Sequence, residues 1–172
     1  MTPTSLAAAY VVCVLAGSAF HKTLAPARAV DAAGRLLGRG AAVAASGVLA
    51  AGFLEVASAL ALLAPGGFRL GLAGAALVWF AYAAAALMAW ARGNRRIDCG
   101  CNFGSTHRDS DVRAVAAKAT ALAALAVVLA RSGDASVRLD LLSLSAGLTI
   151  VALGFATSQI SNNRQHQGAR AS

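Results

Sequence analysis

The chain has 172 residues, of which 58% are hydrophobic and 13% charged, with a formal net charge of +8. Because soluble domains carry about a quarter charged residues, this composition argues against a soluble domain and predicts a single integral membrane domain. The basic residues stand at the ends of hydrophobic runs, where Lys and Arg orient membrane helices, and form no groove-lining pattern. We therefore expect a lipid bilayer as a partner, and no nucleic acid.

The first hydrophobic run predicts a membrane span at about residues 5–21. The small residues from Ala16 to Ala19 would also suit the cleavage site of a signal peptide. A signal peptide begins with a basic segment, however, and no charged side chain precedes His21. A retained first span is therefore the preferred interpretation. The basic segment 22–40 that follows has apolar residues near helical spacing, which favours a short helix in the membrane interface.

Two further spans are predicted at 41–63 and 70–91. The only charged residue between Arg39 and Arg69 is Glu55, and Pro65-Gly66-Gly67 ends the earlier of the two spans. No charged residue lies between Arg69 and Arg92, a length that crosses about 30 Å of hydrocarbon. This third span is the clearest in the chain.

A polar loop at 92–111 precedes the fourth predicted span, at 112–130, and a fifth and more polar one is expected at 141–160. The tail at 161–172 is polar, and we expect it to be disordered. Alanine and glycine are abundant in the spans, and small residues let membrane helices approach closely. The predicted fold class is all-α: an integral membrane bundle of four to five transmembrane helices, occupying residues 1–160.

The polar loop contains the pair Cys99-Gly100-Cys101. In an extended chain their Cα atoms would lie about 6.6 Å apart, at the upper limit of disulfide geometry. Gly100 eases the bend that closes the ring, and a strained ring is readily reduced, which suits thiol–disulfide exchange. Arg95 and Arg96 just upstream would favour the thiolate, the reactive form of cysteine.

Two other interpretations of this loop stay open. The cysteines could be an incidental pair, or they could bind a metal together with His107 and an aspartate at position 98, 109 or 111. Structural zinc sites usually contain a second ligand pair, which the chain lacks, so we expect no metal and no cofactor. Cys13 lies within the first span, where it fits better as a small apolar residue than as a third redox thiol.

Glu55 is the other residue that needs an explanation. A carboxylate inside a span costs about 2.5–3.5 kcal/mol on insertion scales, so it should face the bundle and find a partner. By residue type the candidates are Lys22, His21 and Lys118. Glu55 could be a structural residue that holds the helices together, or part of a proton relay coupled to the thiols. It could also be the site of a small transporter. We consider the transporter the weakest interpretation, because no pair of broken helices marks such a site.

The loop from Arg92-Gly93 to Cys99-Gly100-Cys101-Asn102-Phe103-Gly104 resembles that of the MauE family of methylamine utilisation membrane proteins, which are related to the DoxX-like small membrane proteins. Lys22-Thr23-Leu24 and Phe53-Leu54-Glu55 resemble two shorter elements of the same family. The resemblance covers roughly residues 5–130. Asn102 is an insertion relative to the family's loop, and the Arg-Asn pair common early in the family's fourth span is absent.

The resemblance implies an accessory role in making a periplasmic, disulfide-rich methylamine dehydrogenase, alongside a thioredoxin-like protein. We therefore expect a thiol–disulfide partner in the maturation of an exported dehydrogenase or a similar disulfide-containing client. Cys99 and Cys101 would exchange, and Gly100, Arg95, Arg96, Glu55 and Lys22 would support them. The alternative is a non-catalytic membrane scaffold or assembly factor with structural cysteines.

The expected location is the inner (plasma) membrane, with several spans. With five spans, most basic residues fall on the side that holds the Cys-Gly-Cys loop. The positive-inside rule then places this loop in the cytoplasm and the N-terminus outside.

Overall fold

The computed structural model describes residues 2–97, 110–132 and 139–168, and this part of the chain is almost entirely helical. The elements in chain order are α1 (Pro3–Leu24), α2 (Pro26–Leu37), α3 (Ala41–Leu63), α4 (Phe68–Ala91), the two short strands β1 (Arg96–Ile97) and β2 (Ser110–Asp111), α5 (Val112–Ser132) and α6 (Leu141–Gly168). Four of the described helices, α1, α3, α4 and α5, are long and apolar enough to cross a membrane. The predicted all-α membrane fold is confirmed.

The helix boundaries follow from local sequence. α1 begins with a capping box, in which the Ser5 backbone N–H donates to the Thr2 hydroxyl and the Thr2 N–H donates to the Ser5 hydroxyl. α2 ends at Gly38, whose φ of 62° is left-handed and is tolerated best by glycine. α2 has no buried residue. It is the short helix predicted within 22–40.

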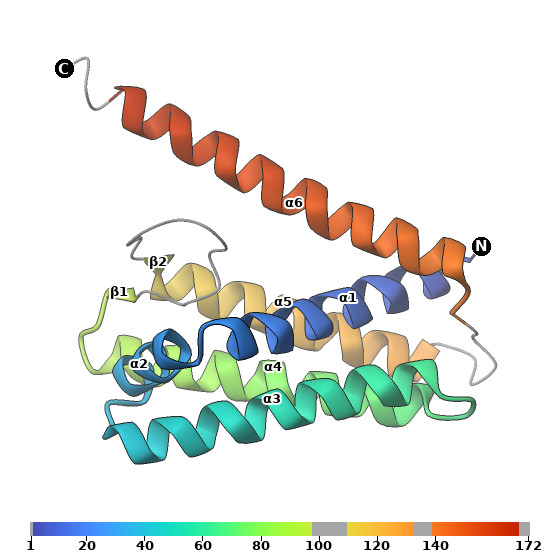
Figure 1. Ribbon diagram of the computed structural model, residues 1–172, viewed down its shortest axis with the longest axis horizontal. Coiled ribbons are helices and arrows are strands. Elements are labelled where there is room, and N and C mark those ends of the chain that lie inside the picture. Colours follow the sequence, from blue (N-terminus) through green and yellow to red (C-terminus); the bar gives the residue numbers. More distant parts are fainter. Residues whose placement is uncertain (1, 98–109, 133–138, 169–172) are drawn as a thin grey trace.

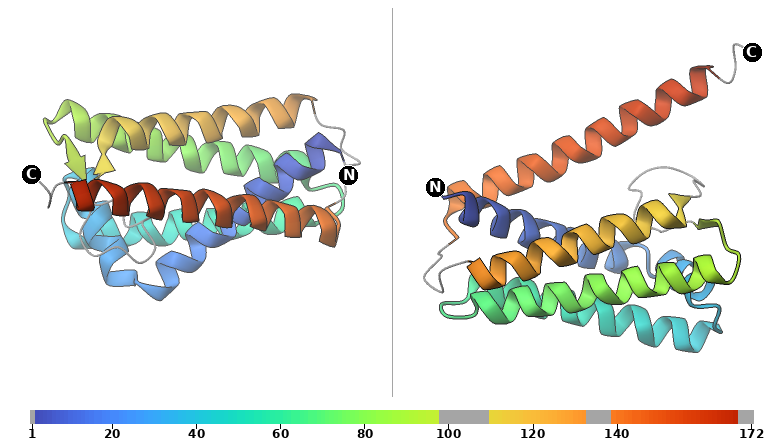
Figure 2. Two further views of the ribbon diagram at one scale, coloured as in Figure 1. Left: turned by 90° about the horizontal axis from the view of Figure 1, so that it is seen from above. Right: turned by 180° about the vertical axis from the view of Figure 1, so that it is seen from behind.

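α4 is the central helix of the bundle. It packs against α3 on one side and α5 on the other, while α1 lies across α3 and contacts α6 (Figure 1). α2 lies at the end of the bundle where α4 ends and α5 begins, in contact with α3 and α4 (Figures 1 and 2). The two strands pair antiparallel at this same end, with Arg96 opposite Asp111 and Ile97 opposite Ser110.

Small residues fill the interior, and large apolar residues lie outside. Most of the buried apolar residues are alanines, whereas Leu49, Phe53, Leu70 and Leu77 are exposed. In water this distribution would be unfavourable, but in lipid it leaves apolar side chains in hydrocarbon and lets helices pack closely. The distribution is what a membrane bundle requires.

Glycines mark two of the closest helix contacts. A Cβ atom added to Gly71 of α4 would lie 2.6 Å from Leu62 Cγ and 2.8 Å from the Ser58 carbonyl oxygen, both on α3. A Cβ atom on Gly147 of α6 would lie 2.8 Å from the Ala9 carbonyl carbon of α1. A side chain at either position would overlap the neighbouring helix, so only glycine allows the helices to approach this closely. This agrees with the prediction that small residues let the helices pack closely.

α6 differs from what the sequence suggested. Asp140 caps it, with the Ser143 N–H donating to Asp140 Oδ1 at 2.8 Å. The apolar part among the residues searched is Leu141–Gly154, shorter than the other four spans, so the fifth span at 141–160 stays a prediction. The helix then continues to Gly168, which contradicts the expected disorder of the tail up to that residue. The physical reason is that no proline or glycine interrupts the chain between Gly154 and Gly168.

Candidate functional site

A carboxylate lies fully buried in the middle of the bundle. Glu55 of α3 is 0% exposed, and it accepts hydrogen bonds from Lys22 Nζ of α1 at 2.7 Å on Oε1 and 2.6 Å on Oε2. The Lys22 side chain is itself only 16% exposed. Burying either charge alone would cost several kcal/mol, and the pairing offsets that cost.

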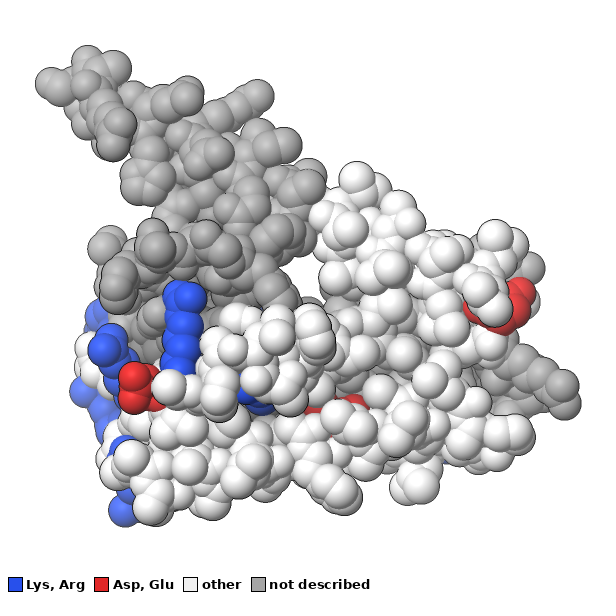
Figure 3. All heavy atoms as spheres, viewed as in Figure 1, with Lys and Arg blue, Asp and Glu red and all other residues white. Residues whose placement is uncertain are grey.

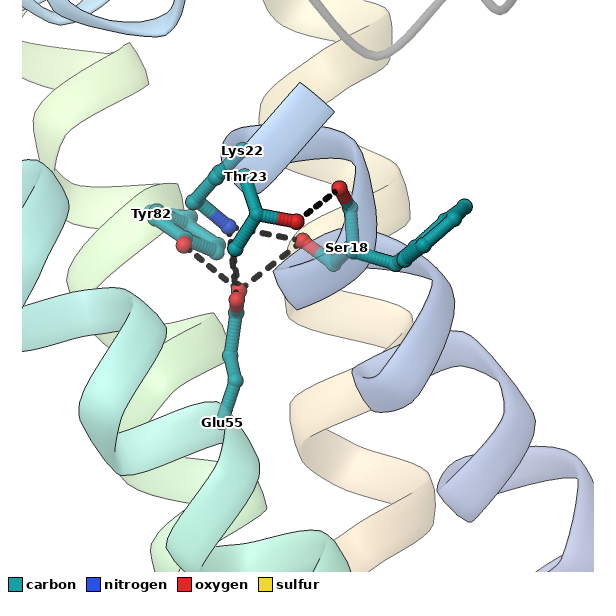
Figure 4. A network of polar contacts seen from close by, with 6 residues as sticks. Ser18, Lys22, Thr23, Glu55 and Tyr82 are labelled. Atoms are coloured by element: carbon teal, nitrogen blue, oxygen red, sulfur yellow. Dashed lines mark hydrogen bonds and ion pairs between the residues drawn. The ribbon is translucent and has the colours of Figure 1, made fainter. Parts of the chain in front are cut away.

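Two hydroxyl groups complete this network (Figure 4). The Ser18 hydroxyl of α1 donates to Glu55 Oε1 at 2.9 Å and accepts a hydrogen bond from Lys22 Nζ at 2.8 Å. The Tyr82 hydroxyl of α4 donates to Glu55 Oε1 at 2.7 Å, and Lys22 Nζ lies 5.4 Å from the centre of the Tyr82 ring. The network therefore joins three helices: α1, α3 and α4.

Helical spacing explains how α1 contributes two members. Ser18 and Lys22 are four residues apart and so lie on one face of the helix, directed at α3. The three ammonium hydrogens of Lys22 have three acceptor atoms in Glu55 and Ser18, and the carboxylate accepts four hydrogen bonds. A neutral, fully hydrogen-bonded pair of this kind is suited to holding helices in a single register.

Of the three partners considered for Glu55 from sequence, the structure brings Lys22 to it. Lys118 is exposed on α5. Ser18 and Tyr82 were missed by the sequence analysis. Their signal was present but weak: Ser18 precedes Lys22 by one helical turn, and Tyr82 is a hydrogen-bonding residue in an otherwise apolar span.

The Cys-Gly-Cys loop lies outside the described residues. This holds for Cys99, Gly100 and Cys101, and also for His107 and the aspartates at 98 and 109, so both the exchange and the metal interpretations stay predictions. Of the proposed metal ligands only Asp111 is described, and its Oδ1 accepts the backbone N–H of Arg113 at 2.8 Å. Within residues 2–97, 110–132 and 139–168 no three His, Cys, Asp or Glu side chains are grouped as a metal site would need.

The supporting arginines of that loop are partly described. Arg95 lies over the Trp90 ring, with its guanidinium carbon 5.3 Å from the ring centre, and the guanidinium carbon of Arg113 lies 5.0 Å from the same centre. Arg96 belongs to β1 and pairs with Asp111 of β2. The end of α4, the start of α5 and the strand pair therefore meet at Trp90.

Cys13 is half-buried in α1, as expected for a residue within a span. Its thiol lies 3.8 Å from the Leu144 carbonyl oxygen of α6, within reach of a weak S–H hydrogen bond. This contact places Cys13 between α1 and α6, in line with a packing role.

Comparison with known proteins gives one finding. The family described as methylamine utilisation protein MauE matches residues 1–132 of the chain. The match runs from α1 to the end of α5 and includes the Cys-Gly-Cys loop and both members of the Lys22–Glu55 pair, while α6 lies beyond it. Neither the curated proteins nor the solved structures contain a match.

Proposed function

We propose that this chain, which belongs to the MauE family of methylamine utilisation proteins, is a membrane thiol–disulfide partner in the maturation of an exported dehydrogenase or a similar disulfide-containing client. Membership of the family makes it a multi-pass membrane protein linked to methylamine utilisation. The observation that carries the finer proposal is the sequence Cys99-Gly100-Cys101 in the polar connection between α4 and α5.

The pairing of β1 with β2 supports this proposal. Because Ile97 lies opposite Ser110, the segment 98–109 begins and ends at the same place, beside the ends of α4 and α5. Cys99 follows β1 by two residues. The connection that contains the two cysteines therefore starts and ends at residues that are anchored to α4 and α5.

The proposed chemistry is ordinary thiol–disulfide exchange. The Cys99 thiolate attacks a disulfide of a thioredoxin-like protein or of the client, one sulfur of that disulfide leaves as a thiolate, and a mixed disulfide forms. Cys101 then attacks Cys99 in the mixed disulfide. The partner leaves as a dithiol with two electrons and two protons gained, and Cys99 and Cys101 are left as a disulfide. The reverse sequence oxidises the partner.

The Lys22–Glu55 network is assigned a supporting role. It joins α1 and α3 to α4, the helix that leads into the loop. Holding α4 in register fixes where the loop begins.

A trapping experiment tests the proposal. In Cys101→Ser the mixed disulfide on Cys99 cannot be resolved, so a covalent complex with a thioredoxin-like protein or a client should accumulate in membranes and disappear on reduction. Cys13→Ser is the matched control, because it removes a thiol from a span and should leave exchange unchanged. Alkylation across a glutathione series should show Cys99 and Cys101 cycling together. If the thiols of Cys99 and Cys101 both stayed fully alkylatable under oxidising conditions, the proposal would be wrong.

The same variants separate the proposal from the scaffold alternative. The double variant Cys99→Ser/Cys101→Ser should lose client maturation, measured as the yield of client with complete disulfides. Normal maturation in this variant would identify the chain as a non-catalytic scaffold. A stoichiometric metal bound to the two thiols would favour a metal site.

A further inference from the structure

Basic residues gather at one end of the bundle (Figure 3). They include residues on or just after α2, just after α4 and at the start of α5: Arg28, Arg35, Arg39, Arg92, Arg95 and Arg113. The acidic residues on the elements of this end are Asp31 of α2 and Asp111 of β2, so the basic residues outnumber them. At the opposite end, the described basic residues are Arg69 and Arg131, and Asp140 accompanies them. The basic end therefore attracts anions more strongly than the other end does.

At this end of the bundle, two of the arginine side chains lie over the ring of Trp90. Arg95 and Arg113 lie 5.3 and 5.0 Å from the centre of its ring, and both side chains are exposed. In the described part of the chain neither guanidinium group forms an ion pair with a carboxylate. An anion bound beside the ring would supply the missing negative charge, and guanidinium groups match phosphate oxygens in geometry.

The helices around Arg95, Arg113 and Trp90 are packed against one another. Leu36 of α2, Trp90 of α4 and Val115 of α5 pack around the same small core of buried residues: Ala86, Ala89, Val112 and Ala116. The Arg92 guanidinium also donates a hydrogen bond to the Leu36 carbonyl oxygen, which ties α2 to the end of α4. The positions of Arg95 and Arg113 are thus set by three helices that are themselves held together.

We propose that Arg95 and Arg113, stacked on Trp90, bind the phosphate of an anionic phospholipid. Leu87 lies one turn before Trp90 on the same face of α4 and is 52% exposed, so the surface changes from cationic to apolar along the helix toward the hydrocarbon. A phospholipid has an anionic phosphate followed by apolar acyl chains, in the order that matches this surface. Free phosphate could contact only the guanidinium groups. Basic pockets at the ends of membrane helices are known to bind anionic headgroups, and tryptophan favours the interface.

This site does not depend on the proposed thiol exchange, and lipid binding can be measured without a client. The full-length protein in a neutral detergent is titrated with short-chain phosphatidylglycerol, and its tryptophan fluorescence and thermal midpoint are followed. Phosphatidylcholine of the same chain length and inorganic phosphate are titrated in parallel. We expect binding of phosphatidylglycerol that weakens with salt, and little response to the other two.

Four variants distinguish a specific site from a general effect of charge. Arg95→Gln and Arg113→Gln should each weaken phosphatidylglycerol binding about 5-fold, and the double variant about 30-fold. Arg131→Gln is the matched control, since it removes the same charge from the other end of α5 and should leave the affinity within a factor of about 2. An unchanged double variant, or an equal loss in Arg131→Gln, would overturn the proposal. Equal binding of inorganic phosphate would show an anion site in place of a lipid site.

Discussion

Lys22 and Glu55 are opposite charges whose separate burial in a membrane bundle would be unfavourable. Their nitrogen and oxygen atoms are 2.6 Å apart, and hydroxyl groups from α1 and α4 use the remaining hydrogen-bonding capacity of Glu55 Oε1. At the scale of single residues, each member of this network has its position set by hydrogen bonds to the others.

Removing one charge of the pair should therefore destabilise the bundle. Lys22→Met leaves a buried carboxylate unpaired and Glu55→Gln leaves a buried ammonium unpaired, and each should cost roughly 3–5 kcal/mol. The double variant Lys22→Met/Glu55→Leu should recover most of this loss, because no unpaired charge remains. The free energy of unfolding in mixed detergent measures both effects. Lys118→Met, which removes an exposed lysine, is the control. Equal losses in the single and double variants would contradict the pairing.

The Tyr82 hydroxyl should contribute less than either charge. Tyr82→Phe removes a hydrogen bond to a charged oxygen and should cost about 1.5–3 kcal/mol. Tyr10→Phe, which removes a tyrosine hydroxyl from α1, should have a smaller effect. A double-mutant cycle with Glu55→Gln tests the contact directly, and an interaction energy near zero would show that the hydroxyl contributes independently of Glu55.

At the scale of helices, contacts are made where glycine removes a side chain. α3 approaches α4 at Gly71, and α6 approaches α1 at Gly147. The two contacts differ in extent, because α4 is packed on two sides, whereas α6 stays near α1 at its beginning and diverges from the bundle toward its C-terminal end (Figure 1). The α1–α6 contact should therefore be the easier one to open.

Gly147→Leu should separate α6 from α1, because its Cβ alone would overlap the Ala9 and Tyr10 backbone. The readout is the alkylation rate of Cys13, whose thiol contacts the Leu144 carbonyl of α6, in a Cys99→Ser/Cys101→Ser background. We expect Cys13 to react faster. Gly154→Leu is the matched control on the same helix, since among the described residues no heavy atom beyond the local backbone lies within 4 Å of an added Cβ. The alkylation rate of Cys13 should be unchanged in this variant. Identical rates in both variants would argue against the docked position of α6.

At the scale of the whole molecule, large apolar side chains are exposed on the described helices. Basic residues gather at one end of the bundle (Figure 3). Wild-type protein should remain in membranes washed with alkaline carbonate, because α1, α3, α4 and α5 are each long enough to span the hydrocarbon. A peripheral protein of similar size should be released in the same wash. Release of this chain would contradict the membrane bundle.

We predict the orientation of the bundle from its charges. By the positive-inside rule we expect the end with α2, β1 and β2 to face the cytoplasm, together with the loop that contains Cys99 and Cys101. Activity of a reporter fused after Gly104 should therefore show a cytoplasmic position, and a fusion after Ala64, in the turn between α3 and α4, should report the other side. The opposite pair of results would show that the charge distribution does not set the orientation.

This orientation has a consequence for the proposed function. The cytoplasm keeps thiols reduced, whereas the client expected from the family is exported. Exchange at a cytoplasmic loop can serve such a client only if reducing equivalents cross the membrane. A loop found outside would make that transfer unnecessary and would allow direct exchange with the client.

The sequence by itself determined the elements of this protein. Apolar runs of about 20 residues have one stable structure in lipid, a helix that satisfies its own backbone hydrogen bonds, so four spans could be located from these runs. The segment of α2 could be located from the helical spacing of its apolar residues. The cost of a buried carboxylate also indicated that Glu55 needed a partner. Helix continuation to Gly168 was missed, because polarity argues for solvent exposure and says little about helix formation.

Only the tertiary structure decided which residues meet. Lys22, Ser18 and Tyr82 reach Glu55 from two other helices, and the Trp90 cluster joins α4 to α5, through contacts that depend on how each helix is rotated about its axis. In a membrane span nearly every position is apolar, so the sequence carries only a weak periodic signal of which face turns inward. The rotation is set instead by glycine contacts and by the few buried polar groups, whose partners are identified only once the helices are packed.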